Sequence, residues 1–181
     1  MWGEGELPLL QLSEFIEHNR YDFFKIKHIA YRNESGIKCS TAHDNEYVDL
    51  SDSGLLPDYE DYFRWKKVLK LRLRKTFLTN GHSYLPIEGS RGCHWNKCNF
   101  CYLNSGYKYR LKSIEQIVAE IEYMIGKYNI YVFEFLDNDL VGKDIDRFNE
   151  LLDAFIKIKT ANPEFLIIVA EIITKDLDKD T

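Results

Sequence analysis

Residues 84–102 read YLPIEGSRGCHWNKCNFCY, and this stretch decides how the second half of the chain is expected to fold. It opens with a strand candidate, Tyr84 to Glu88, and continues into a loop that carries three cysteines. Ser113 then begins a helix, with Gln116 at the spacing of a capping box. In parallel α/β folds such a loop lies at the carboxyl end of the strand, where ligands bind. The three cysteines therefore mark the candidate functional site.

Strands and helices keep alternating after this loop. Apolar residues recur at helical spacing from Ile114 to Ile125, and β-branched and aromatic residues in Ile130 to Leu136 predict a buried strand. Ile145 to Phe155 has the spacing of a second helix, which Asn162-Pro163 ends because the residue before proline avoids helical geometry. Phe165 to Ile173 predicts a third buried strand. The order predicts an α/β fold with three parallel strands and two right-handed crossover helices.

The predicted sheet is smaller than a complete domain of this kind. Three strands and two helices are fewer than a closed barrel needs. A parallel sheet also needs both of its faces covered. We therefore expect the natural protein to continue past Thr181.

The first part of the chain predicts a small α+β region. Pro8 to His18 suits a short helix with apolar side chains on one face. Ile26 to Arg32 and Ile37 to Ser40 predict two strands, which the turn residues Asn-Glu-Ser-Gly at 33–36 join into a hairpin. Cys39 stands apart from the other cysteines and is expected to be a small buried or half-buried thiol.

Two segments of opposite charge follow the hairpin. Residues 44–61 hold seven acidic side chains and the breakers Gly54 and Pro57, so we expect mostly loop. Residues 64–75, RWKKVLKLRLRK, are strongly basic. Two interpretations stay open: the basic segment binds an anionic partner, such as a nucleic acid or an acidic peptide, or it is a solvated face that offsets the acidic segment before it.

Composition narrows the class of protein. The 181 residues carry a net charge of −5, which disfavours nucleic acid as a partner because general binding depends on neutralising phosphates. No apolar run is long enough to cross a membrane, and the first residues, MWGEGELP, do not resemble a signal peptide. Clustered cysteines without a secretion signal favour a reducing compartment, the cytoplasm, where such clusters usually bind metal.

The spacing of the cysteines narrows the kind of metal site. Cys93, Cys98 and Cys101 lie within nine residues, so their thiolates can wrap one face of a metal centre. Structural zinc and ferredoxin-type 4Fe–4S sites want four protein ligands, and a fourth is not obvious here. His94 adjoins a cysteine, and neighbouring residues rarely ligate one tetrahedral ion, while Cys39 is distant in sequence but not excluded in space. Three thiolates without a fourth indicate a cluster with one open iron.

The loop from Ser90 to Cys101 also matches a family pattern, SRGC-x-W-x-x-C-x-F-C. On these residues the chain resembles the radical S-adenosylmethionine (SAM) superfamily, and within it the subgroup that includes cobalamin-dependent and peptide-modifying enzymes. The first gap between cysteines is four residues, where the usual superfamily signature has three. Gly3 to Glu6, GEGE, resembles the last turn of that subgroup's cobalamin-binding domain, and Leu55 to Tyr59 resembles its linker.

The resemblance implies domains and cofactors. Residues 1–80 would form a linker region, with the end of a cobalamin-type domain and the hairpin, and residues 81–181 the N-terminal half of a radical SAM core domain, a partial (β/α) barrel. Cys93, Cys98 and Cys101 would hold a 4Fe–4S cluster whose open iron binds SAM. Reductive cleavage of SAM would yield methionine and a 5′-deoxyadenosyl radical that takes hydrogen from a substrate. Cobalamin would bind only through a missing upstream domain.

Four further residues are candidates for holding SAM by the same resemblance. Asp137 would accept hydrogen bonds from the ammonium of SAM, or it is a turn or capping aspartate. Phe100 and Tyr102 flank the last cysteine and would pack near adenine, or against the loop. Arg110 would pair with the carboxylate of SAM or with Glu88, or lie at the surface. The implied partners are SAM, a flavodoxin- or ferredoxin-type reductant and a substrate that the sequence does not name, a peptide being one candidate.

Two other functions stay open. A zinc- or cluster-stabilised module would use the basic segment 64–75 to bind nucleic acid or peptide without radical chemistry. An electron-transfer protein would need a fourth ligand, with Cys39 as the candidate, and would bind no SAM. If the chain is instead a piece of a radical SAM enzyme, half of the barrel is missing, so we expect weak SAM binding and little or no activity alone.

Overall fold

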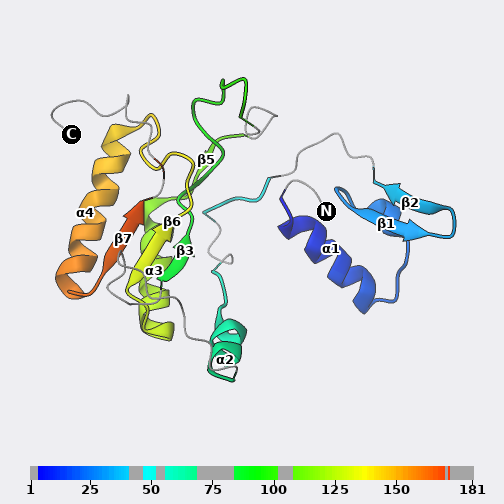
Figure 1. The fold of residues 1–181 in the computed structure, drawn as a ribbon, viewed down its shortest axis with the longest axis horizontal. Helices are drawn as coiled ribbons and strands as arrows, with labels where there is room; N and C mark the ends of the chain where they lie inside the picture. The colour runs from blue at the N-terminus through cyan, green and yellow to red at the C-terminus, as the bar shows by residue number, and fades with distance from the viewer. Residues whose placement is uncertain are drawn as a thin grey trace. The chain divides into compact units, whose positions relative to one another are not determined.

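The computed structural model describes residues 4–40, 47–51, 56–68, 84–101, 108–169 and 171. The chain divides into two compact units, Met1–Asp49 and Leu50–Thr181. Figure 1 shows the helices and strands of both units. Within the described ranges, no helix is both long enough and apolar enough to cross a membrane. The domain boundary between residues 80 and 81 stays a prediction.

The first unit consists of a helix and a hairpin. Its elements are α1 (Glu6–Glu17), the short 3-10 helix η1 (Phe23–Lys25), and the antiparallel strands β1 (Ala30–Asn33) and β2 (Gly36–Cys39). Asn33 closes the turn by accepting from the backbone N–H of Ser35 at 3.0 Å, and Gly36 has the positive φ of +107° that glycine adopts without strain. The predicted helix and hairpin are confirmed. The first strand starts at Ala30 and not at the predicted Ile26, because residues 27–28 form a turn in which His28 has a φ of +58°.

The prediction that Cys39 is a buried or half-buried thiol was wrong, because its side chain is exposed at the end of β2. The neighbouring Ser40 is buried instead, and its hydroxyl accepts from the backbone N–H of Ile29 at 3.1 Å. Since successive residues of a strand face opposite sides, burying Ser40 turns Cys39 outward.

The second unit is an α/β structure built on a parallel sheet. Its elements in chain order are α2 (Glu60–Val68), β3 (Tyr84–Ile87), β4 (Ser90–Arg91), β5 (Arg110–Leu111), α3 (Ile114–Tyr128), β6 (Val132–Phe135), α4 (Ile145–Ala161) and β7 (Leu166–Val169). Strands β3, β6 and β7 pair in that order, all parallel (Figure 1). Ser113 caps α3 by accepting from the backbone N–H of Gln116 at 3.1 Å, as predicted. The predicted α/β class and the three parallel strands are confirmed.

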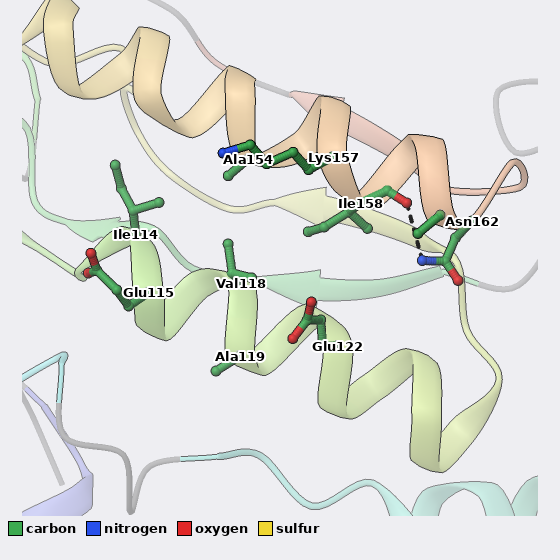
Figure 2. A pocket seen from close by; sticks show the side chains of 10 residues that line it. Ile114, Glu115, Val118, Ala119, Glu122, Ala154, Lys157, Ile158 and Asn162 are labelled. Atoms are coloured by element: carbon green, nitrogen blue, oxygen red, sulfur yellow. Dashed lines mark hydrogen bonds between the residues drawn. The ribbon is translucent and has the colours of Figure 1, made fainter.

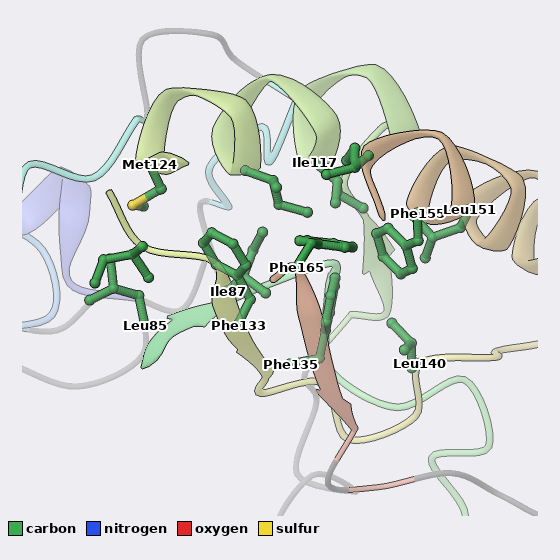
Figure 3. Close-up of a cluster of buried hydrophobic side chains, with 13 residues drawn as sticks. Leu85, Ile87, Ile117, Met124, Phe133, Phe135, Leu140, Leu151, Phe155 and Phe165 are labelled. Carbon is green, nitrogen blue, oxygen red and sulfur yellow. The ribbon is translucent and has the colours of Figure 1, made fainter. Parts of the chain in front are cut away.

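The core lies between one face of this sheet and the helices α3 and α4 (Figure 3). The strands contribute alternate residues, because successive side chains of a strand face opposite sides. Leu85 of β3 is level with Phe133 of β6, and Ile87 is level with Phe135. Phe135 meets Phe155 of α4 with ring centroids 5.7 Å apart. The helices add Ile117, Ile121 and Met124 from α3 and Leu151 and Ile158 from α4. This packing fixes where each strand ends, and therefore where the site residues begin.

The acidic segment 44–61 is only partly loop. Residues 47–51 and 56–59 hold no helix or strand, as predicted, but α2 begins at Glu60. The helix is held by Tyr128 at the end of α3, whose hydroxyl accepts from the backbone N–H of Tyr59 at 2.9 Å. Phe63 stacks on the ring of Tyr128 with centroids 5.1 Å apart. A contact between residues so far apart in sequence is what makes this helix form.

The described start of the basic segment supports the interpretation as a solvated face. Arg64 lies in α2 and its guanidinium is 2.9 Å from the carboxylate of Asp61, with both side chains largely exposed. The charges of the two segments thus begin to offset each other within one helix. Residues 69–75 of the basic segment lie outside the described residues.

Candidate metal centre

The cysteine loop is closed at its base by a short antiparallel ladder. Strand β4 follows β3 almost at once and pairs with β5, so that Ser90 is level with Leu111. The backbone N–H of Lys112 donates to the carbonyl of Gly89 at 2.8 Å and extends the ladder. Gly92 begins the loop with a φ of +84°, and a Cβ there would lie 3.1 Å from the carbonyl oxygen of Lys108. The two ends of the loop therefore pass close together, with room only for glycine.

Asp137 joins the ends of the first two strands of the sheet. It follows β6 and is 3 % exposed. Its two carboxylate oxygens accept from Gly89 and Ser90, at 2.9 Å from the backbone N–H and 2.6 Å from the hydroxyl. The loop and Asp137 thus lie at the same edge of the sheet, which the proposed SAM site requires. In this structure the contacts of Asp137 are those of a residue that holds the base of the loop.

The surroundings of Asp137 change the pKa of its carboxyl group. Burial disfavours the charged form and raises the pKa of Asp137 from 3.8 to about 6, although its hydrogen bonds from Ser90 and Gly89 act in the opposite direction. A buried carboxyl group at the carboxyl edge of a parallel sheet is the kind of group that active sites contain.

A second buried pair links the cysteine loop to the segment after β6, and the sequence indicated no role for either residue. The imidazole Nδ1 of His94 lies against the carboxylate Oδ2 of Asp139, and the two side chains are 3 % and 0 % exposed. Tyr109, near the other end of the loop, presents its ring to His94 with centroids 6.1 Å apart. Burial and the charge of Asp139 raise the pKa of Tyr109 to about 12. Sequence spacing does not reveal this pair, because its members are separated by two strands and a helix.

The three cysteines are free thiols with half-buried side chains. The backbone N–H of Cys101 donates to the carbonyl of Cys98 at 3.1 Å, which forms a turn between the last two. Within the part of the chain that the structure describes, no three His, Cys, Asp or Glu side chains are gathered closely enough to hold a metal ion. The donor set itself fits an iron–sulfur cluster, because Cys93, Cys98 and Cys101 are accessible thiols on one loop. Binding one would have to draw their sulfur atoms together.

Of the remaining predicted site residues, Phe100 and Arg110 are described by the structure. Phe100 is 93 % exposed, so its ring is in solvent. Arg110 lies in β5 at the base, and partial burial lowers its pKa. Glu88 accepts from the guanidinium of Arg91 at 2.7 Å. Tyr102 lies outside the described residues. The roles of these residues toward SAM stay predictions.

A buried ion pair links the base of the cysteine loop to α3. Lys112, next to β5, places its ammonium 2.7 Å from the carboxylate of Glu120 on α3. The carbonyl of Lys112 accepts from the guanidinium of Arg147 on α4 at 2.7 Å. Burial raises the pKa of Glu120, while Lys112 acts to lower it. Both crossover helices are thereby tied to the backbone that closes the loop.

A groove of about 490 Å³ between α3 and α4 is separate from this site (Figure 2). Val118 and Ala119 of α3 line it opposite Ala154 and Ile158 of α4. No predicted site residue lines it. We therefore assign the function to the cysteine loop and not to this groove.

The fold of this chain is similar to that of solved structures. A three-stranded parallel sheet with two crossover helices, preceded by a small α+β unit, is shared with solved structures of cobalamin-dependent radical SAM enzymes. No protein-family model matches the chain, and no curated protein matches its sequence.

Two of the solved structures define the extent of the likeness. The cobalamin-dependent SAM radical enzyme OxsB, with aqua-cobalamin bound, superposes with a TM-score of 0.61 at 22 % identity, over 85 % of this chain and 20 % of that one. The radical SAM methyltransferase TsrM from Kitasatospora setae, with cobalamin and a [4Fe-4S] cluster bound, has a TM-score of 0.53 at 16 % identity, over 91 % of this chain and 32 % of that one. This chain thus spans about a fifth of OxsB and about a third of TsrM.

Proposed function

We propose that this chain is the part of a radical SAM enzyme that holds a 4Fe–4S cluster through Cys93, Cys98 and Cys101. The observation that carries the proposal is the position of the loop, which follows β3 and is fixed beside Asp137 at the carboxyl ends of two parallel strands. The fold shared with OxsB and TsrM supports the same assignment. Once bound, the cluster would supply the electron that cleaves SAM to a 5′-deoxyadenosyl radical.

The residues of the chain would prepare the site in three ways. The ladder between β4 and β5 holds the base of the loop in place. The three thiolates ligate three irons and leave the fourth open to the amino and carboxylate groups of SAM. Phe100 and Tyr102 would cover the adenine, and Arg110 would face the carboxylate of SAM. The exposed ring of Phe100 has apolar surface to bury on such a ligand, and burying it would be favourable.

We propose two roles for Asp137: it holds the base of the cysteine loop, and it binds the ammonium of SAM. Its oxygens already accept from Gly89 and Ser90, and an ionised carboxylate has further lone pairs for the ammonium of SAM. Because its pKa is about 6, the group is mainly ionised at neutral pH and suited to bind that cation.

The partners and the compartment follow from the same proposal. A flavodoxin- or ferredoxin-type protein in the cytoplasm would deliver the electron, and the substrate, a peptide being one candidate, would bind to the barrel walls that the matched part of the fold does not include. Cobalamin would be held by a domain upstream of residue 1. The described residues would form one side of a partial (β/α) barrel, so SAM would be surrounded on that side only. We therefore expect slow or no cleavage of SAM by these 181 residues, and no modification of a substrate.

Anaerobic reconstitution with iron and sulfide tests the proposal. About four irons per chain are expected, with a brown colour that zinc would not produce. Replacing Cys93, Cys98 or Cys101 with Ala should abolish the cluster, whereas the matched control Cys39→Ala, at an exposed thiol of the first unit, should leave it intact. Loss of the cluster in Cys39→Ala would favour electron transfer with four protein ligands. Zinc binding without iron binding would favour the zinc-stabilised module.

A further inference from the structure

The segment 139–142, which follows β6, is buried along its whole length although it belongs to no helix or strand. Leu140 and Val141 are each 3 % exposed and Asp139 is fully buried. Gly142 has a φ of +68°, and a Cβ there would lie 2.5 Å from the hydroxyl of Tyr109. The segment is therefore in contact with the cysteine loop at a position where no side chain beyond hydrogen fits.

Both ends of the loop meet this segment. Near the first cysteine, His94 places Nδ1 against Oδ2 of Asp139. Near the other end, Tyr109 packs against Gly142 and presents its ring to His94. These contacts are made by residues 94 and 109, which lie outside the paired residues of the β4–β5 ladder. They therefore hold the loop at points that the backbone ladder does not reach.

Asp139 and His94 are buried against each other. A carboxylate removed from water is unfavourable by several kcal/mol unless a charged or hydrogen-bonding partner compensates it. The imidazole of His94 is such a partner and is itself 3 % exposed. Because consecutive Cα atoms are about 3.8 Å apart, fixing the ring of His94 also restricts the position of Cys93.

We propose that His94 and Asp139 are positioning residues for the cysteine loop: the buried contact between Nδ1 of His94 and the carboxylate of Asp139 fixes the loop at Cys93, so that Cys98 and Cys101 close onto a fixed first ligand. The part of this inference that concerns the cluster rests on the proposed function. The positioning of the loop does not rest on the proposed function, and it can be measured without metal.

The first experiment uses the metal-free full chain and amide hydrogen exchange. His94→Ala should speed exchange of amides 92–101 about tenfold or more, because a charge-assisted hydrogen bond is lost, while α3 and α4 stay protected. His94→Asn, whose amide nitrogen takes the place of Nδ1, should restore most of the protection. Lys97→Ala, at an exposed residue of the same loop, is the matched control and should exchange like the wild type. In the double variant His94→Ala/Asp139→Ala, amides 92–101 should exchange no faster than in His94→Ala, since both residues act through one contact.

The second experiment reconstitutes the same variants with iron and sulfide. His94→Ala should lose its iron to a chelator about tenfold faster than the wild type, with an altered electron paramagnetic resonance spectrum after reduction, and His94→Asn should resemble the wild type. Unchanged exchange and unchanged iron loss in His94→Ala would overturn the inference, and so would faster exchange spread evenly over the sheet and both helices. If no variant and no wild type takes up iron but the exchange results hold, the proposed function fails while the positioning role stands.

Discussion

The ammonium of Lys112 lies 2.7 Å from the carboxylate of Glu120, and only 8 % and 4 % of the two side chains are exposed. Lys112 adjoins the strand that closes the cysteine loop, and Glu120 lies in the second turn of the helix that follows it. The pair therefore sets the distance between the base of the loop and α3. A buried pair of this kind is expected to matter most when only one partner is removed.

Lys112→Met should lower the free energy of unfolding by about 3–5 kcal/mol at pH 8, because it leaves Glu120 charged and buried. Burial already raises the pKa of Glu120, and loss of the lysine would raise it further, so the variant should lose less at pH 5 than at pH 8, because lower pH favours the neutral form of Glu120. Urea unfolding at both pH values measures this. The double variant Lys112→Met/Glu120→Leu should recover most of the loss. A double variant as unstable as the single one would show that the pair is not the cause.

Asp137 should contribute a recognisable pH dependence to stability. Its pKa is raised from 3.8 to about 6, so between these values the folded protein holds a proton that the unfolded chain has released. Stability must then fall as pH rises from about 4 to about 6, by at most about 1.4 kcal/mol per pH unit for this one group. Asp137→Asn should remove that part of the slope, which unfolding titrations of both proteins measure. An unchanged slope would show that Asp137 does not titrate in this window.

Two glycines should respond to alanine in opposite directions. Gly92→Ala should destabilise the protein by about 1–3 kcal/mol, because its φ is +84° and the new Cβ would meet the backbone at Lys108. Gly126→Ala, in α3 with nothing within 4 Å of a Cβ, should stabilise it by about 0.5–1 kcal/mol. Thermal unfolding of the metal-free chain measures both changes. Equal shifts of the same sign would contradict the difference in local geometry.

Tyr128→Phe should loosen α2 and little else. The hydroxyl of Tyr128 donates to Asp58 at 2.6 Å and accepts from the backbone of Tyr59 at 2.9 Å, at the start of that helix. The ring that stacks on Phe63 remains, so the fold should be kept while amides 60–65 exchange faster. Tyr131→Phe, whose hydroxyl donates to Asn129 nearby in sequence, is the control and should leave α2 unchanged. Equal exchange in wild type and Tyr128→Phe would show that the stacked ring alone holds the helix.

The elements with strong local signals were predictable from the sequence. Helix α3 has a capping serine at Ser113 and a regular apolar stripe, and α4 ends where Asn162-Pro163 forbids further helical geometry. The parallel order of the strands followed from their alternation with these helices. In each case the deciding physics lies within a few residues of the element itself.

The features that were missed depend on contacts between distant residues. Helix α2 is short and highly charged, and it forms because Tyr59 and Phe63 meet Tyr128. The strands β4 and β5 are two residues each, too short for any periodic pattern. The position of Asp137 after a strand was predictable, but its partner Ser90 lies in another strand, and nothing in the sequence indicates that pairing.

The ladder between β4 and β5 also separates the residues that close the loop from the residues of the loop that carry Cys98 and Cys101. None of residues 95–101 is buried, whereas the backbone bonds that close the loop lie at residues 89–91 and 110–112. Changes within 95–101 should therefore leave the sheet and its helices undisturbed. The length and composition of this part of the loop can therefore vary without a change in the scaffold that presents the cysteines.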